Sequence, residues 1–128
     1  MKPPVSPELT EFVIRNALVY YGRSDRISIT SWQNILSAEE KARAKRMQDE
    51  QHRQTFITTR IALRSLLGNI LSLPPDQVMI QINPAGKPFL PDSTLDFSIS
   101  HTRNSFLIGF NPDGLIGVDM EILTGSEN

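Results

Sequence analysis

Hydrophobic side chains recur at helical spacing through the middle of the chain and at strand spacing towards its end. From Asp49 to about Ser72, apolar residues return every three or four positions, which is typical of a helix with one face in a core. A shorter helix is predicted from Ala38 to about Met47, because Ser37 and the acidic residues after it form a capping signal. Pro74 and Pro75 end the helical region, since proline cannot continue the hydrogen-bond ladder.

Beyond residue 76 the pattern changes to short alternating or apolar runs. We predict strands at VMIQI, LDFSIS, SFLIGF and LIGVDMEI, with turns at NPAGKP and NPDG. The earlier run NALVYYG is predicted to be an edge strand, and residues 1 to 12, which contain three prolines, a loose arm. Helices followed by antiparallel strands predict an α+β fold, with helices packed on a small antiparallel sheet in a single domain of 128 residues.

Composition narrows the possible functions. The formal net charge of -1 gives no general attraction to nucleic acid or an anionic membrane. The chain has no cysteine, which excludes disulfides and thiolate chemistry. No segment approaches the roughly 20 apolar residues that span a bilayer, and the first residues lack a signal-peptide core. We therefore expect a soluble, cytoplasmic protein.

Three arginines fall on one narrow arc of the longer helix. Spacings of seven and four residues bring Arg53, Arg60 and Arg64 to the same face. Apolar residues flank this arc, whereas a solvated charged face would lie opposite the apolar one. Two interpretations are open. The arginines pair with buried carboxylates, as buried charges usually do, or they receive a phosphate, which suits the guanidinium fork.

Two acids, Asp119 and Glu121, lie one residue apart in the last apolar run. In a strand, alternate residues face the same way, so both carboxylates would point to one side. A hard cation such as Mg²⁺ takes one or two carboxylates together with waters and substrate phosphates. Gly117 leaves room for a close backbone approach. A solvated strand face is the commoner explanation for an isolated pair of this kind.

His101 ends the alternating run DFSISH, where a strand gives way to the turn TRNS. A nucleophilic pair with Ser100 is poorly supported, because the strand–turn–helix context and an orienting acid are missing. A capping or core histidine and a donor to a phosphate remain as alternatives. Lys87 follows Gly86 in a turn that would hold its ammonium stiffly, and an exposed turn lysine is the plain alternative.

Taken together, these segments resemble the 4′-phosphopantetheinyl transferase superfamily, and within it the large pseudo-dimeric type that activates peptide synthetases, polyketide synthases and fatty-acid systems. The resemblance runs from about Ser37 to Leu123, through LSAEEKARAKRM, RIALRSLL, GKP, FSISHT and IGVDME. It implies one half of a pseudo-two-fold transferase fold. It also implies the reaction, in which 4′-phosphopantetheine moves from coenzyme A to a serine of an acyl or peptidyl carrier protein.

The resemblance further implies roles for individual residues. Asp119 and Glu121 match the acids that hold Mg²⁺ against the pyrophosphate of coenzyme A, and with His101 they form the expected catalytic set. Arg64 could be structural instead. The expected coenzyme contacts are Lys87, Ser100, His101, Arg43, Arg53 and Arg60.

Members of this type have two similar halves with the active site between them, and the second half carries a W-x-x-K-E-like helix motif. Trp32 is the only tryptophan, and no such helix follows it. We therefore expect residues 1–128 to be the N-terminal half of a larger enzyme, inactive or very weak alone. Its face for the missing half would be exposed, which favours association with that half or with itself.

Two other classes of function are alternatives to the enzyme half. One is a non-catalytic half-domain for coenzyme A binding or protein association. Its binding of coenzyme A would not depend on Mg²⁺, whereas that of an enzyme half would. A nucleic-acid binder built on the basic segment from Lys41 to Arg64 is disfavoured, because the net charge is near zero and the arginines are embedded among apolar residues. The expected partners are coenzyme A and a carrier protein, without nucleic acid or membrane.

Overall fold

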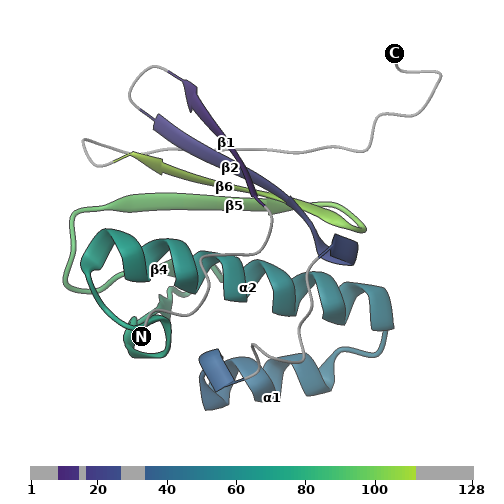
Figure 1. The fold of residues 1–128 in the computed structure, drawn as a ribbon. Coiled ribbons are helices and arrows are strands. Elements are labelled where there is room, and N and C mark those ends of the chain that lie inside the picture. The colour runs from purple at the N-terminus through teal and green to yellow at the C-terminus, as the bar shows by residue number, and fades with distance from the viewer. Residues whose placement is uncertain (1–8, 15–16, 27–33, 112–128) are drawn as a thin grey trace.

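The protein is described by a computed structural model over residues 9–14, 17–26 and 34–111. A four-stranded antiparallel sheet lies over one long helix, and a shorter helix lies beyond the long one (Figure 1). The helices are α1 (Ala38–Arg46) and α2 (Glu50–Leu71). The sheet has the order β1-β2-β6-β5, with β1 (Leu9–Ile14), β2 (Ala17–Arg23), β5 (Asp96–His101) and β6 (Ser105–Asn111). The predicted α+β fold, with helices packed on a small antiparallel sheet, is confirmed.

Short elements connect the larger ones. A 3-10 turn, η1 (Ser24–Arg26), follows β2, and a second, η3 (Pro75–Gln77), follows α2 where the prolines end the helix. β3 (Gln81–Ile82) and β4 (Pro88–Phe89) pair as a small antiparallel hairpin separate from the sheet.

Both helices begin at the predicted caps. Ser37 Oγ accepts a hydrogen bond from the Glu40 N–H at 3.1 Å, and Glu40 Oε1 accepts one from the Ser37 N–H at 2.9 Å. Asp49 caps α2 by accepting from the His52 N–H at 3.1 Å. Ser72 ends α2 in the left-handed region, with φ of 58°. The helix boundaries are local properties of the chain, which is why the sequence indicates them well.

The long helix is buried on two sides. Towards the sheet it contributes to a core of Ala62, Leu63, Leu67, Val78, Leu90, Phe97, Phe106, Ile108 and Phe110. Towards α1 it contributes to a second cluster of Leu36, Ala44, Phe56, Ile57 and Ile61. Burial on both sides leaves little solvated surface on the middle of α2. Charged side chains there must therefore pair with a group of opposite charge or border a hollow.

The N-terminal expectations need correction. A loose arm is wrong for residues 9 to 12, which belong to β1 and pair with β2 from Leu9 opposite Gly22 to Ile14 opposite Ala17. β2 is not an edge strand, because it lies between β1 and β6. Strand pairing with distant segments decided both points, and local sequence does not display it. Of VMIQI, the structure describes a strand only at Gln81–Ile82. Residues 112–128, with the predicted strand LIGVDMEI, lie outside the described ranges.

Within the described ranges, no helix combines the length and apolar character needed to span a lipid bilayer.

Candidate functional site

Four of the predicted site residues, Arg43, Arg60, His101 and Lys87, line three hollows. The arginine pocket, of about 190 Å³, is lined by Ser37, Glu39, Glu40, Arg43, Arg46, Phe56, Arg60, Ile80 and Ile82. The histidine pocket, of about 280 Å³, is lined by Asp49, Gln51, His52, His101, Thr102 and Arg103. The lysine pocket, of about 370 Å³, is lined by Ala85, Gly86, Lys87, Pro88, Phe97, Ser98 and Ile99. The arginine and histidine pockets are built by elements distant in sequence, whereas the lysine pocket is built by residues 85–88 and the nearby β5.

The arginine pocket concentrates positive charge around one aromatic ring. The guanidinium carbons of Arg43 and Arg60 lie 5.0 Å and 5.2 Å from the centre of the Phe56 ring. Only 7% of the Arg60 side chain is exposed, and its nearest acidic group is Glu40 Oε2, at 3.8 Å from Nη1. Burial lowers the pKa of Arg60, while Glu40 acts in the opposite direction. The pocket therefore contains a buried guanidinium that is stacked but weakly paired, which is the state expected of an anion-binding group.

Glu40 is farther from Arg60 than from Arg64, with which it forms a close ion pair. Arg64 Nε donates to Glu40 Oε1 at 2.8 Å, and Arg64 Nη1 donates to the carbonyls of Pro75 at 3.0 Å and Val78 at 2.8 Å. The Arg64 guanidinium thus joins α1 to α2 and to the segment after α2. Of the two interpretations of the arginine arc, pairing with a buried carboxylate holds for Arg64, in line with the structural role allowed for it.

Arg53 lies outside the arginine pocket lining. Its Nε donates to the Ala44 carbonyl at 3.1 Å and its Nη2 to the Met47 carbonyl at 2.5 Å, and it is also paired with Glu50. These bonds satisfy carbonyls at the end of α1, a favourable place for a cation. The coenzyme contact expected of Arg53 stays a prediction.

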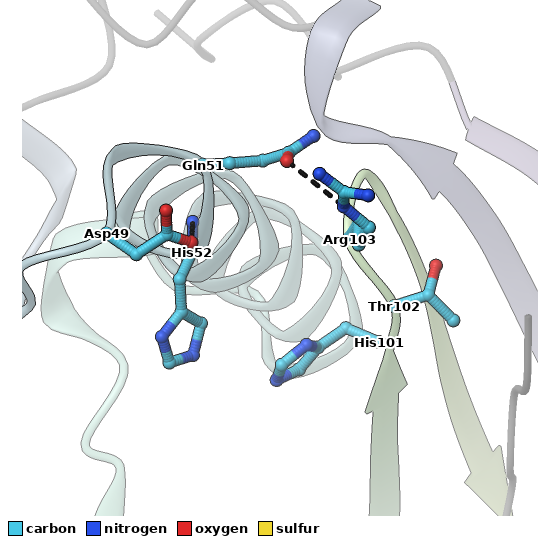
Figure 2. Close-up of a pocket in the computed structure, with 6 residues that line it drawn as sticks. All are labelled: Asp49, Gln51, His52, His101, Thr102 and Arg103. Carbon is cyan, nitrogen blue, oxygen red and sulfur yellow. Dashed lines mark hydrogen bonds between the residues drawn. The ribbon is translucent and has the colours of Figure 1, made fainter.

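The histidine pocket brings His101 of β5 against His52 of α2. The two ring centroids are 5.9 Å apart and the ring planes are inclined by 35°. Figure 2 shows both imidazoles projecting into one hollow, with the Arg103 guanidinium beside Gln51 at its rim. Burial lowers the pKa of His101, and the charges of His52 and Arg43 lower it further, whereas a backbone hydrogen bond at Thr102 raises it. Arg43 therefore acts on both pockets.

The position of His101 follows from the way its turn is attached to α2. Thr55 Oγ1 donates to the Arg103 carbonyl at 2.7 Å, and the Ser24 N–H donates to the Asn104 carbonyl at 2.8 Å. The turn closes on itself through the Thr102 N–H and the Ser105 carbonyl, at 2.9 Å. β5 and β6 are thereby held against the first turns of α2, which sets the distance between the two histidines.

Lys87 lies on the stiff turn that its neighbours predict. Gly86 has φ of 88°, and Asn83 Oδ1 accepts hydrogen bonds from the Ala85 and Lys87 N–H groups, both at 2.9 Å. The Lys87 ammonium lies 3.4 Å from Asp96 Oδ1. Lys87 and His101 line different hollows, so the structure does not place them in one cavity.

Of the remaining predicted residues, the structure describes only Ser100. Ser100 is half-buried and pairs with Leu107 in the β5–β6 register, on the sheet face opposite to His101. Asp119 and Glu121 lie outside the described residues. Among the residues that are described, no group of three or more histidine and acidic side chains could hold a metal ion.

Sequence reasoning missed several residues that line these pockets, among them Arg46, His52, Phe56 and Arg103. A signal was present for two of them. His52, Phe56 and Arg60 follow each other at intervals of four on α2, so they share a helix face with the predicted arginine. Arg103 is brought in by the turn after β5, and Arg46 by α1, which only tertiary packing determines.

Comparison with known proteins shows the family of the chain. Residues 25–109 match the family model described as 4′-phosphopantetheinyl transferase, N-terminal. The chain therefore belongs to the 4′-phosphopantetheinyl transferase family.

Individual relatives support the assignment. The chain is 42% identical over 103 residues to a putative 4′-phosphopantetheinyl transferase of Synechocystis sp., covering 78% of this chain and 42% of that protein. It is 41% identical over 92 residues to the 4′-phosphopantetheinyl transferase HetI of Nostoc sp., covering 69% of this chain and 39% of that protein. The chain thus spans about two fifths of the length of these relatives.

Proposed function

We propose that this chain supplies the coenzyme-binding part of a 4′-phosphopantetheinyl transferase. In the proposed reaction, a serine hydroxyl of an acyl or peptidyl carrier protein displaces adenosine 3′,5′-bisphosphate from coenzyme A and becomes esterified to phosphopantetheine. Arg43 and Arg60 bind phosphate in the arginine pocket, His101 binds phosphate in the histidine pocket, and Lys87 makes a further coenzyme contact.

One observation carries the proposal. Arg60 is almost fully buried, its contact with Glu40 is long at 3.8 Å, and it borders an open hollow that Arg43 and Arg46 also line. Keeping a weakly compensated cation buried is costly. A phosphate in the pocket would supply the missing negative charge and accept bidentate hydrogen bonds.

The proposal includes Mg²⁺, with Asp119 and Glu121 as its ligands. Two carboxylates at alternate positions of a strand-like run are the oxygen donors that this ion takes alongside substrate phosphates. When bound, the ion would neutralise charge on the coenzyme pyrophosphate. The proposal for these two residues rests on the chemistry of the donor set.

Calorimetric titration of the chain with coenzyme A tests the proposal. Arg60→Met and Arg43→Gln should each weaken binding about tenfold or more, since a charged hydrogen bond to phosphate contributes about 1.5–3 kcal/mol. Lys45→Gln is the matched control, because Lys45 is an exposed cation of α1 outside the three linings. Unchanged affinity in Arg60→Met would contradict the role of the arginine pocket.

The same titration distinguishes an enzyme half from a binding module. Binding that strengthens with Mg²⁺, and loses that dependence in Asp119→Asn, supports the transferase assignment. Binding indifferent to Mg²⁺ supports a non-catalytic coenzyme A-binding half-domain. Mass spectrometry of a carrier protein incubated with the chain and coenzyme A then measures transfer, which we expect to be absent or very slow with this chain alone.

A further inference from the structure

The two histidines of this chain meet in one hollow. The sequence contains only His52 and His101, one near the start of α2 and the other at the end of β5. Their rings are 5.9 Å apart, and both line the histidine pocket of about 280 Å³ (Figure 2). Both side chains are exposed, so a ligand in solution can reach them.

This meeting is built into the packing of the chain. The bond from Thr55 to the Arg103 carbonyl, at 2.7 Å, holds the turn after β5 on α2. Arg103 Nε also points to Gln51 Oε1, at 3.4 Å, one residue before His52. The helix that carries one imidazole is thus tied at two points to the turn beside the other.

The charged groups around the pair favour an anion. Arg103 lines the pocket from the turn after β5, and Arg43 of α1 is close enough to lower the pKa of His101. The acidic group in the lining is Asp49, whose carboxylate already accepts from the His52 N–H as the helix cap. Two imidazoles and the Arg103 guanidinium therefore line a hollow with one engaged carboxylate, and the Arg43 guanidinium acts on it electrostatically from α1.

We propose that His52 is a second phosphate-binding histidine, which holds one phosphate group of bound coenzyme A from the side opposite to His101. This inference rests on the proposed function for the identity of the ligand. A protonated imidazole donates from both ring nitrogens, and two imidazolium groups repel unless an anion lies between them. Binding of the phosphate therefore takes up protons, and coenzyme affinity rises as the pH falls through the range in which imidazoles become protonated.

Titration with coenzyme A at about pH 6 and about pH 8, on either side of that range, tests the proposal. Affinity should be about tenfold higher at the lower pH. His52→Gln, which keeps a polar side chain but cannot take up a proton, should lose about tenfold at pH 6 and much less at pH 8. Lys45→Gln, the exposed control, should leave the ratio of the two affinities unchanged.

A second ligand identifies the phosphate. Dephospho-coenzyme A lacks the 3′-phosphate and retains the pyrophosphate. If the loss caused by His52→Gln disappears with this ligand, the pair binds the 3′-phosphate, and if the loss persists, it binds the pyrophosphate. Either result supports a phosphate role for His52.

The outcomes separate the two proposals. Absence of coenzyme A binding by the unmodified chain at both pH values contradicts the proposed function. If the unmodified chain binds coenzyme A and His52→Gln binds it equally well at pH 6, the inference about His52 is overturned, whereas the proposed function stands. Nuclear magnetic resonance of the unmodified chain gives an independent check, because two histidines give two imidazole signals. Coenzyme A should shift both, and a His52 signal that stays still would also overturn the inference.

Discussion

Arg60 and Arg64 lie one helical turn apart on α2, yet their surroundings differ. Arg64 has three close acceptors, one a carboxylate and two main-chain carbonyls, and is 3% exposed. Arg60 has an aromatic ring and a carboxylate oxygen at 3.8 Å. A buried cation with complete hydrogen bonding maintains structure, whereas one that borders a hollow with incomplete pairing is suited to a ligand. Pairing with a buried carboxylate therefore accounts for Arg64, and phosphate binding stays the proposal for Arg60.

The residue-scale prediction is a difference between two matched substitutions. Arg64→Met should lower the free energy of unfolding by about 3–5 kcal/mol, because it removes the close partner of buried Glu40 and two carbonyl contacts. Arg60→Met should lower it by less than about 1.5 kcal/mol, because Arg64 still pairs with Glu40 and methionine fills a similar volume. Urea unfolding followed by circular dichroism measures both. Equal losses would show that Arg60 is as structural as Arg64.

At the scale of elements, the attachment of the β5–β6 turn to α2 determines the histidine pocket. Thr55 is 1% exposed, and its hydroxyl is hydrogen-bonded to Arg103 O at 2.7 Å and to Ser24 Oγ at 3.1 Å. One side chain therefore joins the helix to the turn after β5 and to the turn after β2. Thr59, also buried, donates only within the helix, to the Thr55 carbonyl at 2.6 Å.

Replacing each threonine by valine separates these two kinds of bond. Thr55→Val should cost about 1–3 kcal/mol of unfolding free energy, because it leaves a carbonyl and a hydroxyl between elements without their partner. Thr59→Val should cost less than about 1 kcal/mol, since the Thr55 carbonyl keeps its helical N–H. Thermal and urea unfolding give the comparison. If the two variants were equally stable, the turn would not depend on this bond.

The contrast between local and distant information explains what the sequence could predict. Ser37, Asp49 and the prolines after Ser72 are local signals, and both helices begin and end within about a residue of the predicted positions. β1 was missed, because its strand state depends on pairing with β2. The structural role of Arg64 depends on Glu40 of the other helix, so the arginine arc alone could not identify it. His52 was missed because its partner belongs to β5.

At the scale of the whole molecule, the three hollows share elements. Arg43 lines the arginine pocket and acts electrostatically on His101. The β3–β4 hairpin contributes Ile82 to the arginine pocket, and the turn within it contributes Lys87 to the lysine pocket. β5 connects the lysine and histidine pockets along roughly 10 Å of strand, at about 3.3 Å per residue. These shared elements lead to the prediction that one ligand with several phosphates contacts more than one hollow at once.

Hydrogen–deuterium exchange with and without coenzyme A tests whether the hollows act as one site. If they do, residues 37–46, 80–89 and 96–103 should become protected together, because a ligand that bridges α1, the hairpin and β5 restricts local opening of each. β1 should change little, since it lies across the sheet from β5. Arg60→Met should reduce all three protections in parallel. If protection is confined to one segment, the hollows bind separately. The same conclusion follows if Arg60→Met removes protection from residues 37–46 but leaves it in the other two segments. In either case, Lys87 and His101 do not bind the same ligand.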